Sequence, residues 1–266
     1  AYAAYMAKKI LLEKRIYIPV VTTLHGTDIT LVGKNPSYKP AVTFSINKSD
    51  IVTAVSKSLK KDILSSFVIK KDIEVVPNSI DLDLYNMDRP CIKSQIAPNG
   101  EKVISHISNM RPVKRIPDII EIFYRIQEKE DAILLMIGEG PEREKAEQQA
   151  KDLGIYSKVK FLGKTSEIRR LLCMSDLFLL TSSTESFGLV ALEAMAAKVP
   201  IISSNAGGIS EVNVHGETGF LATVGDVETM AEHGLTLLQN PKLHEEFKAN
   251  AYRRAQEFSI DAVVPK

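Results

Sequence analysis

The chain has 266 residues, enough for about two domains of roughly 150 residues each, and its 44% hydrophobic and 25% charged residues exclude a disordered or collagen-like chain. Its 34 Lys and Arg residues against 33 Asp and Glu residues give a net charge of +1, without the basic surplus that binds a nucleic-acid backbone or an anionic membrane surface. No apolar run reaches about 18 residues, so the sequence predicts no membrane span.

The first 15 residues, AYAAYMAKKILLEKR, have the pattern of an amphipathic helix. Their positive residues are interleaved with or follow the apolar ones, whereas a signal peptide carries its positive charges first. The two cysteines, Cys91 and Cys173, are too few for a disulfide framework and lack metal-ligand spacing, which suits a reducing compartment. We therefore expect a cytoplasmic protein. Because the chain opens on Ala1 and already inside a helix, we also expect that its beginning is missing.

Short β-branched runs alternate with helical patterns along most of the chain, which predicts an α/β fold with parallel sheets and crossover helices. The segment 116–129 between two of these runs has a period near 3.6 and predicts a helix. Runs from residue 102 onward are almost wholly apolar, as expected where helices cover both faces of a sheet. The predicted strands lie at 18–25, 50–56, 72–78, 102–108, 132–138, 158–163, 176–182 and 199–204.

The pattern divides the chain into domains. Residues 91–245 fit one complete doubly wound domain, whereas residues 1–78 supply only about three strands, fewer than a self-sufficient sheet usually has. We interpret residues 1–78 as the C-terminal part of an N-terminal α/β domain. A proline, an Asn-Ser turn and alternating acids then break the periodicity and predict an interdomain hinge at 79–90. Residues 246–266 are expected to form a C-terminal helix.

The segment DLFLLTSSTESFGLVALEAMAA is the most informative part of the sequence. A buried strand ends at Thr181, a polar turn follows, and a helix is expected to begin between Phe187 and Leu189. In an open α/β sheet, ligands bind at the carboxyl ends of strands, where helix N-termini offer unpaired N–H groups to anions. The segment therefore predicts a phosphate site.

Two acids flank this predicted site. Glu185 lies in the turn, and Glu193 lies five residues after Gly188, roughly 7.5 Å along a helix that rises 1.5 Å per residue. One acid could bind the hydroxyls of a sugar and the other a ribose diol. The alternative is that Glu185 only complements the helix dipole and Glu193 is a solvated helix residue. The apolar surroundings of Glu193 weaken that alternative.

The segment ESFGLVALEAMA, with seven residues between Glu185 and Glu193, resembles the signature of the retaining glycosyltransferases of family 4. Seven further segments resemble that family in the expected order: LHGTD (24–28), VPNSID (76–81), RPVKR (111–115), IGEGPER (137–143), VKFLG (159–163), NAGGISEV (205–212) and HGETGFL (215–221). The resemblance implies a GT-B fold, in which two Rossmann-like domains face a cleft. The stretches VTTLHGTDITLVGKNPSY, SINKSDIVTAVSKSLK and HISNMRPVKRIPDII most resemble members that join N-acetylglucosamine from UDP-N-acetylglucosamine (UDP-GlcNAc) to L-malate, the first step of bacillithiol synthesis. For those members, the resemblance implies that the transferred sugar retains its α-configuration and that the enzyme uses no metal and no other cofactor.

The resemblance also assigns cations to the donor diphosphate. Lys114 matches the family lysine that contacts the phosphates. The family usually has an arginine about five positions earlier, where this chain has Asn109, so either Arg111 or Arg115 is expected as the companion cation. Alternatively, Lys114 and Arg115 only begin a solvated helix, although cations there oppose the helix dipole.

For the rest of the donor, the resemblance implies that Glu185 contacts the sugar and Glu193 the ribose. Uracil is expected near Phe161 and Leu162, although these two are equally well explained as ordinary core residues. The remaining residues expected at the donor follow Glu185 and include the backbone amides at the start of the helix: Ser186, Phe187, Gly188 and Leu189.

His25 ends the first predicted strand, a position more often structural than catalytic. The resemblance instead implies a place beside the reacting sugar. Thr22 and Thr23 are expected to help bind the acceptor. Since retention in this family is ascribed to attack on the same face as the departing phosphate, no acid and base pair is required.

Several alternatives stay open. The protein could use another acceptor, or be a non-catalytic nucleotide-sugar-binding domain, or be a UDP-sugar epimerase, and a homo-oligomer is possible. The chain lacks the basic amphipathic helix that a membrane-surface acceptor would favour. We assign His106 and His215 structural roles, and Ser79, Ser210 and Lys198 depart from the usual residues of the family. We expect this chain to bind UDP but to need its missing beginning for transfer to malate.

Overall fold

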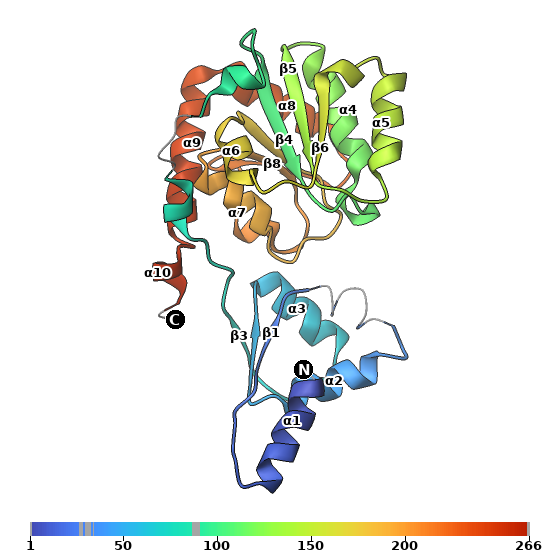
Figure 1. Ribbon diagram of the computed structural model, residues 1–266, viewed down its shortest axis with the longest axis vertical. Helices are drawn as coiled ribbons and strands as arrows, with labels where there is room; N and C mark the ends of the chain where they lie inside the picture. The colour runs from blue at the N-terminus through green and yellow to red at the C-terminus, as the bar shows by residue number, and fades with distance from the viewer. Residues whose placement is uncertain (1, 27–28, 30–32, 34, 87–90, 265–266) are drawn as a thin grey trace. The chain divides into compact units, whose positions relative to one another are not determined.

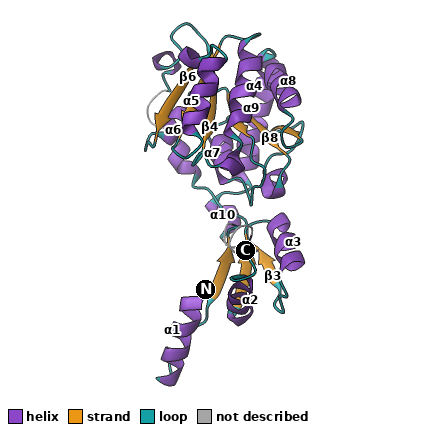
Figure 2. Ribbon diagram, turned by 90° about the vertical axis from the view of Figure 1, so that its right-hand side faces the viewer, coloured by secondary structure: helices purple, strands orange, loops and turns teal. Residues whose placement is uncertain are grey.

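The computed structural model describes residues 2–26, 29, 33, 35–86 and 91–264. The chain divides into two compact units, the first ending at Asn78 and the second beginning at Ser79 (Figure 1). Figure 2 shows helices alternating with strands in both units. The α/β class predicted from the sequence is confirmed.

The first unit, unit 1, contains a parallel sheet of three strands in the order β1-β2-β3. The strands are β1 (Val21–Leu24), β2 (Ile51–Ala54) and β3 (Ile73–Val75). The helices are α1 (Tyr2–Glu13), α2 (Lys39–Lys48) and α3 (Lys57–Ser66). Helix α1 contacts α2 through the rings of Tyr5 and Phe44, whose centroids are 5.2 Å apart, but every residue of α1 stays at least partly exposed.

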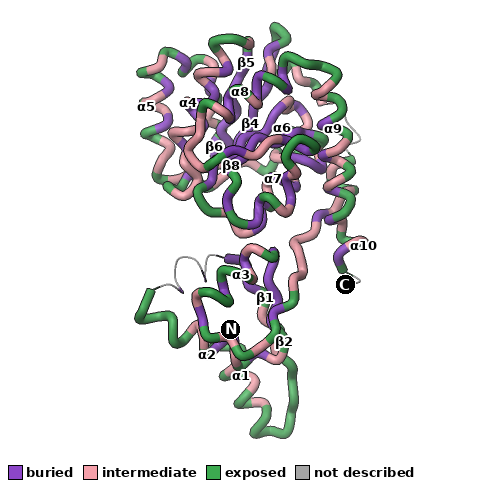
Figure 3. The backbone as a smooth tube through the Cα atoms, turned by 180° about the vertical axis from the view of Figure 1, so that it is seen from behind, coloured by how far each residue is buried: buried purple, intermediate pink, exposed green. Residues whose placement is uncertain are grey.

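The second unit, unit 2, contains a parallel sheet of six strands in the order β6-β5-β4-β7-β8-β9. Figure 3 shows that the strands of this sheet are mostly buried. The strands are β4 (Lys102–Ile107), β5 (Ala132–Ile137), β6 (Val159–Gly163), β7 (Leu177–Leu180), β8 (Ile201–Ser204) and β9 (Gly219–Ala222).

Helices cover this sheet, with α4 packed against α5 and α8, and α7 packed against α9. Helix α4 buries an isoleucine- and phenylalanine-rich face, as its period near 3.6 predicted. The α-helices are α4 (Ile116–Gln127), α5 (Arg143–Asp152), α6 (Ile168–Cys173), α7 (Leu189–Ala196), α8 (Val227–Leu238), α9 (Pro241–Gln256) and α10 (Ile260–Val263). The short 3-10 helices are η2 (Leu82–Tyr85), η3 (Lys93–Gln95), η4 (Pro112–Lys114), η5 (Tyr156–Lys158) and η6 (Gly207–Glu211).

The strand order places a switch point at the centre of unit 2. From β4 the chain builds outward through β5 to β6, then returns to the other side of β4 and builds outward through β7, β8 and β9. The loops after β4 and β7 therefore leave in opposite directions from neighbouring strands. Such a point is where open α/β sheets bind ligands.

Each of the eight strand runs predicted from the sequence contains a strand of the structure. Strand β9 was not predicted, because GFLA is only four residues long and directly follows the turn residues HGET. The hinge at 79–90 stays a prediction, since residues 87–90 lie outside the described residues. Ile80, near its start, is hydrogen-bonded to the C-terminal segment, with its N–H donating to the Phe258 carbonyl at 2.9 Å.

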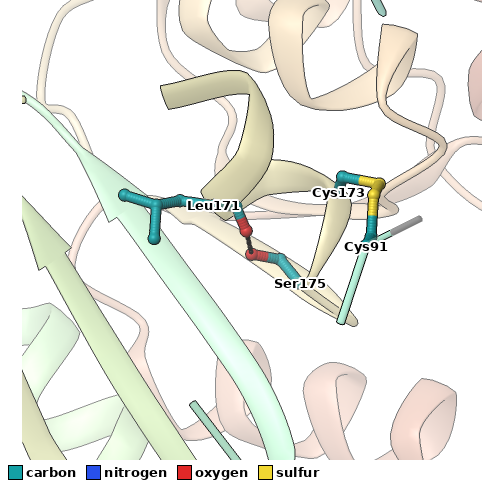
Figure 4. The surroundings of a disulfide bond; sticks show 4 residues. All are labelled: Cys91, Leu171, Cys173 and Ser175. Carbon is teal, nitrogen blue, oxygen red and sulfur yellow. Dashed lines mark hydrogen bonds between the residues drawn. A yellow bond between two sulfur atoms is a disulfide. The ribbon is translucent and has the colours of Figure 1, made fainter. Parts of the chain in front are cut away.

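Cys91 and Cys173 form a disulfide whose Cα atoms are 6.0 Å apart (Figure 4). The bond joins the segment just before η3 to the last residue of α6. It contradicts the expectation that the two cysteines suit a reducing compartment. The sequence did not predict it, because two cysteines 82 residues apart carry no signal that their positions meet in space. In the part of the chain that the structure describes, no helix has the length and apolarity that a membrane crossing requires.

Candidate functional site

The site begins where strands β4 and β7 separate. Their pairing ends at Ser105 and Phe178, although β4 continues to Ile107 and β7 to Leu180. The loops that follow, 108–115 and 181–188, contain most of the predicted donor residues. They therefore flank the switch point of the sheet.

The two loops are tied together by hydrogen bonds. The Thr181 hydroxyl donates to the Lys114 carbonyl at 2.8 Å, and the Ser183 N–H donates to the Val113 carbonyl at 2.8 Å. Within η4, the Lys114 N–H donates to the Arg111 carbonyl at 2.8 Å. The Lys114 backbone is thus fixed from both sides.

Lys114 and Glu185, which come from different loops, meet in an ion pair. Lys114 Nζ lies 2.8 Å from Glu185 Oε2, and the Ser182 hydroxyl donates to the same oxygen at 3.2 Å. The two side chains are 19% and 16% exposed. Both charges therefore stay partly open to solvent, where an incoming anion could compete for the ammonium group.

The backbone of Glu185 is supported by the loop after β8. The Gly208 N–H donates to the Glu185 carbonyl at 2.7 Å. Gly207 has φ of +63°, and a Cβ there would lie only 2.2 Å from the Glu185 carbonyl oxygen. Only glycine allows this approach, so the NAGG segment fixes where Glu185 stands.

Helix α7 begins immediately after this turn, at Leu189, within the predicted range. Gly188 caps it with φ of +92°, and a Cβ there would lie 2.5 Å from Cδ1 of Ile209. Phe187 is buried edge-on against Phe258, with ring centroids 5.6 Å apart, and Ser186 is half-buried. The N-cap residue is thus a glycine, which has no side chain to accept hydrogen bonds from the first N–H groups of α7.

Glu193 lies inside α7 and is half-buried, which weakens its assignment as a solvated helix residue. Burial raises the pKa of its carboxyl group. Burial and the negative charge of Glu193 raise the pKa of Tyr85, while the charge of Arg169 lowers that pKa. Tyr85, a residue that sequence reasoning missed, therefore lies in the electrostatic environment of Glu193.

The three candidate residues around Lys114 differ in their contacts. Arg115, with φ of +50°, holds Asp118 through two hydrogen bonds, Nε to Oδ2 at 2.6 Å and Nη2 to Oδ1 at 3.1 Å. Arg111 is exposed at the start of η4, and Asn109 is exposed with its carbonyl oxygen close to Gly140. The Arg115 guanidinium is thus already engaged within α4, whereas the Arg111 side chain reaches solvent.

Phe161 and Leu162 lie on the edge strand β6 and have different environments. Phe161 packs against the core, with the Arg143 guanidinium 5.8 Å from its ring centroid, whereas Leu162 is 41% exposed. The end of β6 is joined to the end of β5, because the Gly138 N–H donates to the Gly163 carbonyl at 2.9 Å. The core-residue explanation therefore fits the Phe161 side chain but not that of Leu162.

The acceptor-side candidates lie in unit 1. The hydroxyls of Thr22 and Ser49 are 2.7 Å apart, and the Thr53 hydroxyl donates to Thr23 at 3.0 Å. Both threonines line a cavity of about 330 Å³ beside α1 and α2, whereas His25 is exposed just beyond β1. Residues 27–28 of the predicted HGTD turn lie outside the described residues. Unlike the residues around Lys114, these three side chains are not tied to one another.

Sequence reasoning missed Thr181 and Ser183, which hold the two loops together, and Ser182, which donates to Glu185 within its own loop. Their signal was present as the polar cluster TSSTES at a strand end. Of the two histidines given structural roles, His215 accepts the Leu221 N–H at 3.0 Å through Nδ1, and His106 is fully buried in β4.

Lys198 shows why its position usually holds glycine in the family. Its φ is +62°, in the left-handed region, and its Nζ lies 5.1 Å from the Tyr252 ring centroid. The lysine that replaces the usual glycine is therefore accommodated within the turn just after the end of α7.

Two family profiles together match nearly the whole chain. Residues 88–254 match the family described as "Glycosyl transferases group 1", and residues 1–84 match "Glycosyltransferase Family 4". The N-acetyl-alpha-D-glucosaminyl L-malate synthase of Bacillus anthracis is 45% identical over 97% of this chain, and an uncharacterized glycosyltransferase of Methanocaldococcus jannaschii is 31% identical over 76%. The chain spans 66% and 55% of the lengths of these relatives.

Solved structures give the same fold. The crystal structure of Anabaena HepE in complex with UDP superposes with a TM-score of 0.86 at 25% identity, covering 98% of this chain and 73% of that chain. A glycosyltransferase from Rickettsia africae gives a TM-score of 0.79 at 21% identity, covering 97% and 71%. From the matched profiles and this GT-B fold, we conclude that the chain belongs to the group 1 glycosyltransferases of family 4.

Proposed function

We propose that the protein is a retaining, metal-independent glycosyltransferase that moves N-acetylglucosamine from UDP-GlcNAc to L-malate. The observation that carries the donor half is the meeting of Lys114 and Glu185 at the switch point of unit 2. The acceptor half rests on the 45% identity to the malate synthase of B. anthracis. We also propose a cytoplasmic location, where the disulfide between Cys91 and Cys173 would be an exception among proteins of a reducing compartment.

In this proposal the donor diphosphate lies between Lys114 and the first N–H groups of α7. A helix N-terminus carries a partial positive charge and points its N–H groups at an anion. The exposed Arg111 is the better companion cation, because Arg115 is engaged by Asp118. With these groups in place, the site supplies positive charge without a divalent ion.

The remaining donor contacts follow from the same arrangement. Glu185 would accept hydrogen bonds from sugar hydroxyls once the diphosphate draws Lys114 away, and Glu193 would accept them from the ribose. The half-buried position of Glu193 suits a carboxylate that pairs with hydroxyls. Uracil would lie beside the backbone of Phe161 and Leu162 at the end of β6.

The chemical step breaks the bond between the anomeric carbon and the diphosphate oxygen. Negative charge then grows on the leaving diphosphate, where Lys114 stabilises it more strongly than in the ground state. The malate hydroxyl forms the new bond on the same face, and its proton passes to the departing phosphate oxygen. UDP leaves with that proton, and no side chain has to act as nucleophile.

The acceptor contacts belong to unit 1. L-Malate carries two carboxylates, which require fixed donors or cations. Thr22, Thr23 and His25 are proposed to contribute, with His25 beside the reacting sugar.

Calorimetric titration of the chain with UDP, with and without EDTA, tests the donor half. We expect UDP to bind equally well in both conditions. A strict requirement for a divalent ion would contradict the placement of Lys114 and α7 at the diphosphate. Lys145→Ala is a suitable control, since Lys145 lies on α5, outside the two loops, and its exposed side chain is paired with Glu142.

Mass spectrometry tests the acceptor half. UDP-GlcNAc would be incubated with a panel of hydroxy acids, succinate and an amino alcohol, and with either this chain or the chain completed by the part of the B. anthracis enzyme outside the match. Because this chain spans only 66% of that relative, we expect N-acetylglucosaminyl malate from the completed chain but not from this chain alone. We expect no product with succinate, which lacks the attacking hydroxyl. Transfer to an amino alcohol instead would favour an activity like that of the 2-deoxystreptamine N-acetyl-D-glucosaminyltransferase of Niallia circulans, which is 29% identical over 63% of this chain.

A further inference from the structure

His106 takes part in a buried chain of hydrogen bonds that leads to the loop after β4. Its Nδ1 lies 2.9 Å from the Leu179 carbonyl oxygen on β7, and its Nε2 lies 2.7 Å from the Ser108 hydroxyl. The Ser108 oxygen in turn accepts the Met110 N–H at 3.1 Å. These hydrogen bonds thus connect β7, through the histidine ring, to the backbone of the loop.

Each of these hydrogen bonds can be donated in only one direction. A carbonyl oxygen can only accept, so Nδ1 of His106 carries a hydrogen and donates it to Leu179. Full burial lowers the pKa of His106 to about 4, so the ring is neutral and Nε2 is an acceptor. The Ser108 hydroxyl must then donate to Nε2, which leaves its lone pair for the Met110 N–H.

The position of His106 explains why a histidine is useful there. The pairing of β4 with β7 ends at Ser105 and Phe178, so His106, the next residue of β4, is paired with Met136 of β5 but has no ladder partner on β7. The His106 ring bridges the opening and connects β4 to the Leu179 carbonyl. It also stacks on Phe178, with ring centroids 6.4 Å apart.

The loop held by this chain is in a conformation that needs support. Met110 has φ of +39°, which is unfavourable for a residue other than glycine. The Ser108 and Asn109 carbonyls are packed closely against Gly138 and Gly140. Four residues after Met110 comes Lys114, so any shift in the loop moves the start of η4.

We propose that His106 and Ser108 are positioning residues that hold the loop from Ser108 to Lys114 in its donor-binding conformation. The inference rests on the proposed function, because it takes the diphosphate to lie beside Lys114. Neither side chain contacts the substrate in this arrangement; both act through the backbone at Met110.

The test compares two serines of the same segment. Ser108→Ala removes the hydroxyl that links His106 to Met110. Ser105→Ala removes a buried hydroxyl whose one hydrogen bond among the described residues goes to the Leu177 carbonyl, at 3.5 Å. UDP affinity would be measured by calorimetry well below the unfolding temperature of each variant. We expect Ser108→Ala to bind UDP about tenfold more weakly and Ser105→Ala to bind like the unmodified protein.

Two substitutions of His106 separate positioning from folding. The Gln amide reaches the position of Nε2 and can accept from Ser108, whereas the Asn amide reaches the position of Nδ1 and keeps only the bond to Leu179. Positioning predicts that His106→Gln retains more UDP affinity than His106→Asn, whatever their unfolding temperatures.

The outcomes distinguish this inference from the proposed function. If the unmodified protein binds UDP and Ser108→Ala binds it equally well, the inference is wrong while the proposed function stands. The inference is also wrong, and the proposed function still stands, if His106→Asn keeps its affinity for UDP and His106→Gln loses it. If the unmodified protein binds no UDP, the proposed function fails and the inference fails with it.

Discussion

The carboxyl ends of the strands in the two units differ in how they are held. In unit 1, β1 and β2 stay paired to their last residues, Leu24 and Ala54, and the hydroxyls of Thr22 and Thr23 bond sideways to neighbours. In unit 2, the pairing of β4 with β7 stops early, and polar side chains bridge the opening. Where the pairing of two neighbouring strands stops early, a gap opens between their ends. The gap keeps its shape only where other groups replace the lost hydrogen bonds.

The loops around that opening are packed closely against other loops. The turn after β5 approaches the turn after β4, and the turn after β8 approaches the turn after β7, at backbone distance, which is possible only where glycine stands at the contact. The predictions below test whether this bracing is what distinguishes the end of β4 from the end of β1.

The largest expected effect comes from one methyl group added at Gly138. Its φ is +113°, and a Cβ would lie 1.9 Å from the Ser108 carbonyl oxygen. Backbone strain and overpacking together should lower the free energy of unfolding of Gly138→Ala by about 4 kcal/mol. Urea unfolding followed by circular dichroism measures it. Gly154→Ala is the control, because Gly154 has φ of +73° with nothing within 4 Å of the added Cβ. Equal losses in both variants would show that the close approach to Ser108 imposes no constraint.

Replacing Lys114 by Ala tests the chemical role of the end of β4. The ammonium group should stabilise the leaving diphosphate more as its charge develops, so we expect a loss of about 2 to 4 kcal/mol in kcat/KM, with kcat itself reduced. Steady-state kinetics on the active enzyme measures it. Lys145→Ala, whose side chain is 70% exposed, should leave both constants unchanged. Unaltered turnover of Lys114→Ala at saturating donor would remove Lys114 from the diphosphate.

Acid should weaken unit 2 through His106. Its pKa falls from 6.5 to about 4 on burial, so the stability that the neutral ring contributes is complete above pH 6.5 and is lost as pH falls through 4. The difference in pKa corresponds to about 3 kcal/mol. Glu193, whose pKa is raised by burial, has the opposite effect, since its contribution is lost as pH rises. Subtracting the pH profile of His106→Gln from that of the unmodified protein cancels Glu193. A flat difference between pH 7 and 4 would contradict the buried neutral ring.

The smallest effect is expected at the end of β1. Thr22→Val removes one hydrogen bond to Ser49, but the Ser49 hydroxyl still donates to the Ser45 carbonyl at 3.0 Å. The free energy of unfolding should therefore fall by less than about 1 kcal/mol, and UDP affinity should not change. Thermal unfolding and calorimetry measure the two quantities. A large loss of UDP affinity would mean that unit 1 shares in the donor site.

Much of the fold could be predicted because alternating β-branched runs are a local signal. All eight predicted strands and the start of α7 were found from such runs and from turn residues. Contacts between distant residues leave no such signal. The His106 link to Leu179 depends on where the β4–β7 pairing ends, and the choice between Arg111 and Arg115 depends on the engagement of Arg115 by Asp118. Side-chain partners across a sheet, and the disulfide, therefore needed the structure.

The disulfide makes one half of unit 2 a covalent ring. The bond from Cys91 to Cys173 closes a loop through β4, β5 and β6, while β7, β8 and β9 lie outside it. Lys114 therefore belongs to the ring and Glu185 to the open part. If the molecule were pulled by its two ends, the residues inside the ring could not be extended until the disulfide was reduced. Their extended length is roughly 280 Å. Mechanical force would thus separate Glu185 from Lys114, while the disulfide would still enclose β4, β5 and β6.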